Sequence, residues 1–226
     1  MAYLLSVNVG SPVPTAHSDF PTTSIDKRPV TGPVEIAVPG PRGTTPTGLL
    51  GDSISDVKHH GGPDQAVYAY AREDLDRWAA ELGRELTGGV FGENLTTQGL
   101  AVTDALIGER WRIGDEVVLE VSAPRIPCRT FAGWLDEPAW IKRFTVHALP
   151  GAYLRVVRPG SIRAGDPVEV VHSPNHDVTI GVAFRALTLQ PDLLPRLLAA
   201  EALPESTKEK VRARLRPPGS SASPAP

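Results

Sequence analysis

The sequence predicts a mainly β protein in which short strands form a small closed sheet, followed by a small helical appendage. Proline (23 residues) and glycine (21 residues) are both frequent in this 226-residue chain, which favours loops, short strands and few long helices. Strand-like segments joined by a Gly-Asp turn occur twice, as expected for a small closed sheet. After about residue 172 the segments become helical in character, so we expect the architecture to change there.

The first half of the chain contains three candidate strands and one clear helix. Residues 2–9, 34–38 and 66–70 are predicted strands, and the second lies in a segment rich in Pro, Gly, Thr and Ser, residues 11–46. The helix is predicted over residues 72–82. Its early turns carry three acids that the helix dipole favours, Glu73, Asp74 and Asp76. Its apolar residues form one stripe, Leu75, Trp78, Ala79 and Leu82. Gly83 is expected to end it.

The two Gly-Asp turns lie in a weak internal repeat. Residues 112–117 (Arg-Ile-Gly-Asp-Glu-Val) resemble residues 163–168 (Arg-Ala-Gly-Asp-Pro-Val). Each copy continues into β-rich sequence, 118–121 and 169–171, so each Gly-Asp is interpreted as a turn between short strands. Residues 152–157 add another predicted strand.

The C-terminal part is predicted to be a three-helix appendage. Helical segments cover residues 179–189, 192–203 and 205–215, and Pro191 and Pro204 separate them. We therefore divide the chain into a β domain (1–172), a helical extension (175–216) and a tail (217–226). The tail contains only Pro, Ser, Gly and Ala and is expected to be disordered, because it cannot bury a core.

Composition excludes several functional classes. A net charge of −3 gives no general attraction to nucleic acid or anionic membrane, so neither is an expected partner. The single cysteine cannot form an internal disulfide or hold an iron–sulfur cluster, and it fits a reducing compartment. We see neither a signal peptide nor the ~20 apolar residues of a membrane helix. The sequence thus predicts a cytoplasmic protein.

The cysteine follows a predicted strand in a loop that contains two prolines, Ala-Pro-Arg-Ile-Pro-Cys-Arg (123–129). The prolines make this loop rigid. Arg125 and Arg129 flank Cys128, and positive neighbours lower a thiol pKa and favour the thiolate, which is the nucleophile and the metal ligand. The alternative is that Cys128 is a small buried apolar residue.

A second polar segment is His59-His60-Gly61-Gly62-Pro63-Asp64, which predicts a tight turn where backbone can approach a ligand closely. Asp56 precedes His60 by four residues and could orient it as a proton donor near neutral pH. The alternative is an ordinary turn with exposed histidines.

Two further segments contain candidate ligand-binding residues. Glu93 and Asn94, in Phe-Gly-Glu-Asn-Leu-Thr (91–96), could bind the edge of a heterocycle, because a carboxylate accepts hydrogen bonds and an amide both donates and accepts. Lys27 and Arg28, in a loop, could bind a phosphate. The alternative for Glu93 and Asn94 is an ordinary turn, and the alternative for Lys27 and Arg28 is a solvated charge pair.

Together these segments resemble the MOSC family, named for the C-terminal domain of molybdenum cofactor sulfurases. The similarity is to stand-alone bacterial members with a C-terminal three-helix extension, and it covers about residues 3–171, with the helices matching to about residue 215. The motifs that carry it occur in the family's order and spacing: Lys27, His60-Gly61-Gly62-Pro63-Asp64, Phe91-Gly92-Glu93-Asn94-Leu95 and Pro124-Arg125-Ile126-Pro127-Cys128.

The resemblance implies a β-barrel that binds a molybdenum cofactor (molybdopterin), with Cys128 as the metal ligand. It implies that His60 faces the metal, with Asp56 as the residue that orients it. The resemblance also implies that Lys27, Arg28 and Arg125 bind the pterin phosphate. The other implied cofactor-binding residues are Gly61, Gly62, Asp64, Glu93 and Asn94. Relatives in this family reduce N-hydroxylated compounds, including hydroxylamino nucleobases. Thiolate is a soft ligand that suits such a metal, and a histidine can supply a proton.

We therefore expect a reductase of small N-hydroxylated substrates. A sulfur or cofactor carrier that uses Cys128, or a module that only stores the cofactor, is the alternative. Without an iron–sulfur site or a Gly-x-Gly-x-x-Gly unit, electrons must come from a separate reductase. The donor could bind to the positively charged face of the helical extension, which carries Lys208, Lys210, Arg212, Arg214 and Arg216. The alternative is that these helices cap the barrel or form a homodimer contact.

Overall fold

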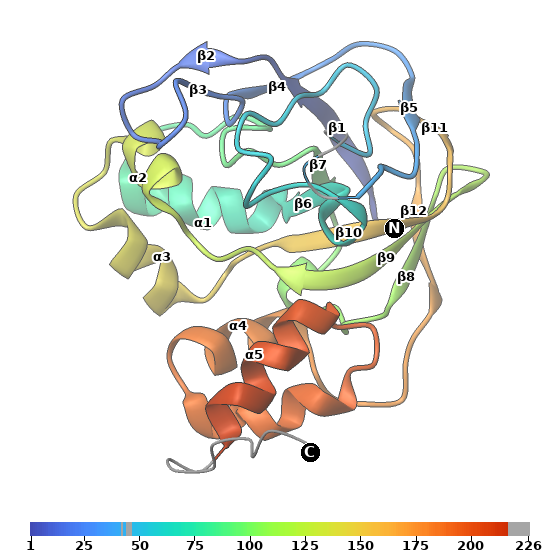
Figure 1. The fold of residues 1–226 in the computed structure, drawn as a ribbon. Coiled ribbons are helices and arrows are strands. Elements are labelled where there is room, and N and C mark those ends of the chain that lie inside the picture. Colours follow the sequence, from blue (N-terminus) through green and yellow to red (C-terminus); the bar gives the residue numbers. More distant parts are fainter. Residues whose placement is uncertain (42, 44–46, 217–226) are drawn as a thin grey trace.

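The computed structural model describes residues 1–41, 43 and 47–216. One mixed sheet of eight strands organises the chain, with helices at two sides (Figure 1). The strands follow in spatial order β12, β8, β9, β10, β6, β7, β1 and β4. In the same order they cover Val168–His172, Arg110–Ile113, Val117–Pro124, Ala152–Arg158, Val67–Ala71, Leu95–Gln98, Tyr3–Gly10 and Lys27–Pro29. The pair β6–β7 is parallel and the other neighbours are antiparallel.

The strand pairs of the described residues do not close the sheet into a barrel. The two ends approach each other where the isolated bridge Tyr3–Pro167 and the bond from Leu4 N–H to Asp166 O (2.9 Å) tie β1 to the segment before β12. Pro167 has no N–H, so a regular ladder cannot continue through it. The closed barrel that we expected is therefore not found, and the fold is a mixed, sheet-dominated one.

Both Gly-Asp sequences form a turn between short strands, as predicted, but only the first turn joins two strands that pair with each other. Gly114 has a positive φ (59°) and joins β8 to β9, which pair as a hairpin. Gly165 also has a positive φ (92°), but it joins β11 (Gly160–Ile162) to β12, and β11 pairs with β5 (Val34–Ile36) in a separate small sheet. Similar local sequence thus forms a similar turn, while the strand partner is decided by the long-range packing.

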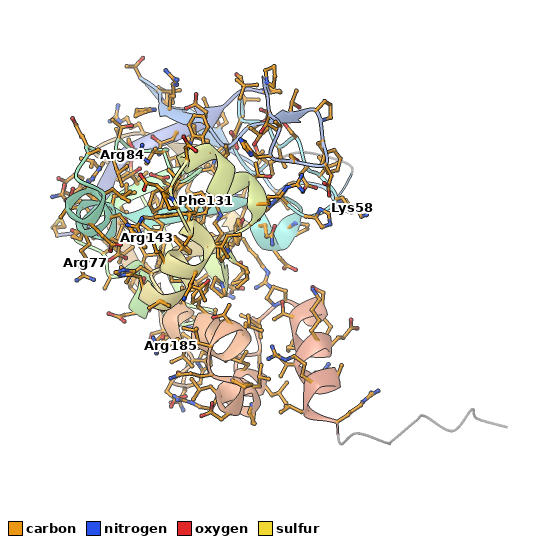
Figure 2. All side chains as sticks on the ribbon, turned by 90° about the vertical axis from the view of Figure 1, so that its left-hand side faces the viewer. Lys58, Arg77, Arg84, Phe131, Arg143 and Arg185 are labelled. Carbon is orange, nitrogen blue, oxygen red and sulfur yellow. The ribbon has the colours of Figure 1, made fainter. Side chains whose placement is uncertain are left out.

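The helix predicted over residues 72–82 is confirmed as α1 (Arg72–Leu82), which Gly83 ends in the left-handed conformation (φ 64°). Two further helices, α2 (Arg129–Leu135) and α3 (Trp140–His147), were not predicted. They are short, and Ala139 and Ala148 bound α3 with positive φ where capping residues would normally signal the ends. A buried aromatic cluster packs these three helices together: Trp78, Phe91, Phe131, Trp140 and Phe144. Figure 2 shows Phe131 on α2 within the upper part of the molecule.

The C-terminal segments form below the sheet (Figures 1 and 2). α4 (Ile180–Thr188) begins at Thr179, whose side chain accepts a bond from Val182 N–H (3.1 Å), and α5 (Glu205–Leu215) matches its predicted bounds. Between them η3 (Pro191–Ala199) is a 3₁₀ helix, which ends earlier than the helical segment predicted over 192–203, and Pro195, which lacks an N–H, lies inside it. The predicted disordered tail, 217–226, lies outside the described residues.

The remaining elements are short. They are β2 (Val13–Pro14), β3 (Thr22–Thr23) and the 3₁₀ turns η1 (Pro63–Gln65) and η2 (Val102–Asp104). Among the helices of the described residues, none has the length and apolar character that crossing a membrane requires.

Candidate functional site

A cavity collects most of the polar residues that the sequence singled out. Its walls come from the loop before β4, the loop 47–56, the turn 60–61, β6, and the loop after β9. The residues that matter chemically are Lys27, Asp52, His60, Asn94, Arg125 and Cys128. Segments up to about 100 residues apart therefore meet in one site, as the sequence predicts for its separate motifs.

Cys128 lies where β9 has ended and α2 begins. It is half-buried and its backbone is extended (φ −127°). Burial opposes ionisation of its thiol, but a hydrogen bond from His60, the charge of Arg125 and the N–H of Phe131 outweigh this and lower the pKa to about 6. The thiol is therefore mostly thiolate at pH 7, the form that binds soft metals.

His60 contacts the sulfur, but Asp56 does not orient its ring as we expected. The Asp56 carboxylate binds Nδ1 of His59 (3.0 Å) and the His59 N–H (3.1 Å). The contact between Asp56 and His60 is a backbone one, in which the Asp56 carbonyl accepts the His60 N–H (3.1 Å). Nδ1 of His60 lies instead 3.5 Å from the hydroxyl of Tyr153 on β10. Adjacent side chains point in different directions, and the three-residue spacing of the turn brings His59 rather than His60 to Asp56.

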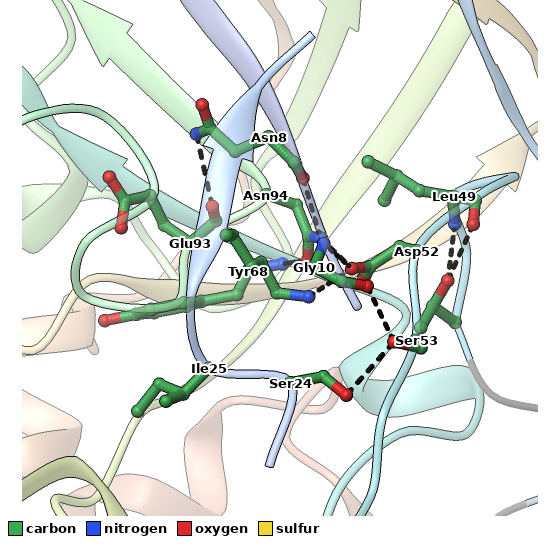
Figure 3. A network of polar contacts seen from close by, with 12 residues as sticks. Asn8, Gly10, Ser24, Ile25, Leu49, Asp52, Ser53, Tyr68, Glu93 and Asn94 are labelled. Carbon is green, nitrogen blue, oxygen red and sulfur yellow. Dashed lines mark hydrogen bonds and ion pairs between the residues drawn. The ribbon is translucent and has the colours of Figure 1, made fainter. Parts of the chain in front are cut away.

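A buried ion pair forms part of the cavity wall. Nζ of Lys27 donates to Oδ1 of Asp52, and the side chains are 8% and 1% exposed. Asp52 also accepts from Gly10 N–H (2.8 Å) and from Nδ2 of Asn94 (2.9 Å), as Figure 3 shows in part. Burial lowers the pKa of Lys27, while the charge and hydrogen bond of Asp52 oppose that shift.

Asn94 joins this network to β6. Its Oδ1 accepts the N–H of Tyr68 (3.1 Å), and its Nδ2 also donates to the carbonyl of Asn8 (3.3 Å). Figure 3 shows Asn94 between Tyr68, Asn8 and Asp52. The side chain thus crosslinks three segments, and it lines the cavity as predicted.

Glu93 is fully buried and does not line the cavity. Its carboxylate accepts from Gly89 N–H (2.6 Å), Phe91 N–H (3.0 Å) and Thr96 Oγ1 (3.0 Å). Burial raises its pKa. Gly89 is needed here because its φ is +89° and a Cβ would lie 2.2 Å from the Lys27 carbonyl oxygen. Of the two roles we expected for Glu93, the structure fits the loop rather than direct contact with a ligand.

Arg125 is a buried cation (5% exposed) held between two rings. Its Cζ lies 5.1 Å from the centroid of Tyr68 and 4.1 Å from that of Phe131, and Nη1 donates to the Phe91 carbonyl. Such cation–π contacts stabilise a desolvated guanidinium. Arg125 lines the cavity and gives it positive charge beside Cys128.

Of four other predicted residues, Gly61 lines the cavity and the other three do not. Arg28 has a 78% exposed side chain paired with Asp26 (2.9 Å), and it does not line the cavity, so the geometry does not support a cofactor contact. Gly61 lines the cavity, whereas Gly62 caps η1. The Asp64 carboxylate pairs with Nε of Arg155 (2.6 Å) and faces a neighbouring groove.

Sequence reasoning missed Asp52, Tyr68 and Tyr153. Asp52 follows a glycine in a loop and resembles any turn aspartate. The two tyrosines lie on β6 and β10, where a strand pattern predicts burial but not a shared cavity; their ring centroids are 5.2 Å apart. The pairing of β6 with β10, a long-range fact, brings them together.

The protein offers one sulfur donor to a metal in this site. Within the described chain, no group of three or more His, Cys, Asp or Glu side chains could hold a metal ion. A metal at Cys128 would therefore need most of its ligands from a cofactor. The half-buried thiolate, with the two buried cations Lys27 and Arg125 in the same cavity, fits an anionic metal-bearing cofactor.

Comparison with known proteins is consistent with this site. Residues 56–169 match the model of the MOSC domain. YflK of Bacillus subtilis (strain 168) is 31% identical over 209 residues, 90% of each chain. Protein YiiM of Escherichia coli (strain K12) is 33% identical over 186 residues, 80% of this chain and 82% of its own. A Gibberella moniliformis protein named Reductase is 34% identical over 138 residues, which are 60% of this chain and 24% of that protein.

Solved structures agree with the fold over nearly the whole chain. The crystal structure of YiiM from Geobacillus stearothermophilus matches with a TM-score of 0.76 at 28% identity, covering 96% of this chain and all of that one (100%). YiiM from Escherichia coli matches with a TM-score of 0.71 at 27% identity, covering 95% of this chain and 92% of its own.

Proposed function

This chain belongs to the MOSC domain family, and from that premise we propose that it binds a molybdenum cofactor through Cys128 and reduces small N-hydroxylated compounds. The observation that carries the proposal is the low-pKa thiol of Cys128 beside His60 and Arg125 in a cavity with a buried lysine. The name Reductase of one matching protein supports the reaction class, although the match covers only 24% of that protein.

Reduction of an N-hydroxyl compound is balanced as R–NHOH + 2H⁺ + 2e⁻ → R–NH₂ + H₂O. When bound, the cofactor would supply the two-electron chemistry, and Cys128 would hold its metal. Lys27 and Arg125 would hold its phosphate, and Gly61 and Asn94 would border it. Arg28 and Glu93 are left out of this contact set because they do not line the cavity.

His60 is the group best placed to handle protons in the site. It hydrogen-bonds Cys128, and its Nδ1 lies 3.5 Å from the Tyr153 hydroxyl. A histidine held in this way can deliver one proton to the oxygen that leaves as water. We further propose that a separate reductase supplies the electrons, and that residues 1–172 and 175–216 act as the β domain and its helical extension.

Metal analysis and turnover test the proposal together. Protein made in a host that synthesises the cofactor should contain molybdenum, Cys128→Ala should lose it, and the wild type should reduce hydroxylaminopurine with an artificial reductant. Equal molybdenum in both proteins would reject Cys128 as ligand. Bound molybdenum without reduction of any N-hydroxylated compound would favour the carrier or storage function.

The sulfur carrier is the second candidate, because a thiol with a pKa of about 6 is also suited to hold a persulfide. Mass spectrometry of the purified protein separates the two functions. One additional sulfur on Cys128, without molybdenum, would support the carrier.

A further inference from the structure

A second groove lies on the other side of Cys128, between the loop after β9 and the C-terminal helices. It shares with the first cavity the residues around the sulfur, namely Asp56, His60, Cys128, Thr130 and Tyr153. Its far wall consists of Leu187 on α4 and the first half of α5, with Ser206, Thr207 and Lys210. Figure 1 shows α5 close beneath the end of β9 that leads to Cys128. Cys128 therefore lines both the cavity and the groove.

The floor of this groove is apolar and rigid. Ile126 is 45% exposed, although a large aliphatic side chain gains free energy from burial. Pro124 and Pro127 fix the backbone on both sides of it, and Pro204 and Leu187 line the groove opposite. A strip of this kind binds the face of a flat ring.

Two lysines of the groove have no carboxylate partner among the described residues. Each of its three carboxylates has a partner: Asp64 pairs with Arg155 (2.6 Å), Asp56 with His59 (3.0 Å) and Asp19 with Arg129 (3.4 Å). Lys58 and Lys210 also line the groove, and among the described residues neither pairs with a carboxylate. Both ammonium groups at the rim of the groove are therefore free to bind an anionic group of a ligand.

Within the described part of the chain, Lys210 lacks a carboxylate partner, whereas the neighbouring cations on α5 have partners. Lys208 and Arg212 both pair with Glu205 (3.0 and 2.5 Å), and Arg214 donates to the Leu187 carbonyl (3.2 Å). These cations are engaged within the helical segment, which weakens their use as a docking face for an electron donor. The unpaired lysine faces the groove that leads to Cys128.

We propose that this groove is the substrate site and that it selects N-hydroxylated heterocycles that carry an acidic group, specifically nucleoside monophosphates. The ring lies on Ile126, the N-hydroxyl group faces Cys128 and His60, and the phosphate binds Lys210 and Lys58. This assignment rests on the proposed reductase function and makes the C-terminal helices a specificity element.

Binding of stable product analogues tests the groove without turnover. The cofactor-loaded protein should bind adenosine monophosphate more tightly than adenosine in calorimetry. Lys210→Gln should weaken the nucleotide by about three- to fivefold, the contribution of one exposed charge pair, and leave adenosine unchanged. Lys142→Gln on α3, an exposed lysine outside the groove, is the matched control. Ile126→Glu should weaken both ligands, because it removes the ring contact and adds repulsion.

Steady-state kinetics completes the test. With a chemical reductant, N6-hydroxy-adenosine monophosphate should have a lower KM than N6-hydroxyadenosine, and Lys210→Gln should remove the difference without changing kcat. Equal binding of nucleotide and nucleoside, or equal losses for both in Lys210→Gln, would overturn the assignment. A defect in Lys210→Gln only with a protein electron donor would also overturn it and support docking. If nucleotide binding shows the expected pattern but neither compound is reduced, the groove assignment stands and the reductase function fails.

Discussion

Replacing Asp52 by alanine should destabilise the protein strongly, although Asp52 is a loop residue. The substitution removes the carboxylate that pairs with Lys27, and both side chains are nearly inaccessible to water (8% and 1% exposed). It also removes the acceptor of Gly10 N–H and of Asn94 Nδ2. Loss of one partner of a buried ion pair costs about 3–5 kcal/mol, and the two unsatisfied donors place this case toward the upper end.

Urea unfolding at pH 7, followed by circular dichroism, measures this loss. Asp26→Ala is the matched control, because Asp26 pairs with the next cation along the chain, Arg28, whose side chain is 78% exposed. Water screens that pair, so the control should unfold close to the wild type. Asp52→Asn keeps the shape and the hydrogen-bond acceptor, so its loss should be smaller than that of alanine.

Equal free energies of unfolding for Asp52→Ala and Asp26→Ala would refute the reasoning, since they would show that burial of the Lys27–Asp52 pair has no energetic consequence. A lower slope of the free energy against urea in Asp52→Ala alone would instead indicate a change in the unfolded or native ensemble. The phosphate-binding role proposed for Lys27 depends on this pair, because Asp52 is what opposes the loss of its proton on burial.

Two further predictions concern the reacting groups. Only the thiolate is alkylated, so the rate at which iodoacetamide modifies Cys128 in cofactor-free protein should rise with pH and reach half its maximum near pH 6. His60→Gln should move that midpoint to higher pH, and a wild-type midpoint above pH 8 would contradict the lowered pKa. Tyr153→Phe removes the hydroxyl near His60 but keeps the ring contact with Tyr68, so kcat for N-hydroxyl reduction should fall while the molybdenum content stays at the wild-type level; unchanged kcat would remove Tyr153 from the site.

The sequence predicted the elements whose signals are local. The acid-rich start, the apolar stripe and Gly83 locate α1 to the residue, and the two prolines around Ile126 predict the rigid loop before Cys128. The α2–α3 pair was missed because its ends lack capping residues and its stability comes from aromatic contacts with Trp78 and Phe91, which are distant in sequence.

The same limit explains the errors in the site. Cys128, His60, Lys27, Asn94 and Arg125 lie in short motifs that each allow an ordinary structural explanation, and the set of motifs in one order, through its resemblance to a family, is what predicted a shared site. Which partner each residue takes depends on three-dimensional packing. Asp56 therefore binds His59, and the counterion of Lys27 is Asp52, 25 residues away.

The C-terminal helices should be indispensable for folding, which makes truncation a poor test of their function. Val178, Ile180, Ala183, Leu194 and Leu197 belong to the same buried cluster as residues of the sheet. Backbone bonds also join the two parts, from Ile107 N–H to Val178 O (3.0 Å) and from Ile180 N–H to Ala105 O (2.9 Å). Each large side chain that loses its burial costs about 1.5–3 kcal/mol.

Deleting residues 174–226 should therefore give protein that aggregates or melts well below the wild type, whereas deleting only residues 217–226 should leave the melting temperature unchanged. Differential scanning calorimetry of the two truncations decides the matter. A 1–173 protein with the wild-type melting temperature would show that the helices pack on an already complete core. In the expected case, function must be dissected with exposed single substitutions such as Lys210→Gln, because these leave the shared core intact while altering the groove beside Cys128.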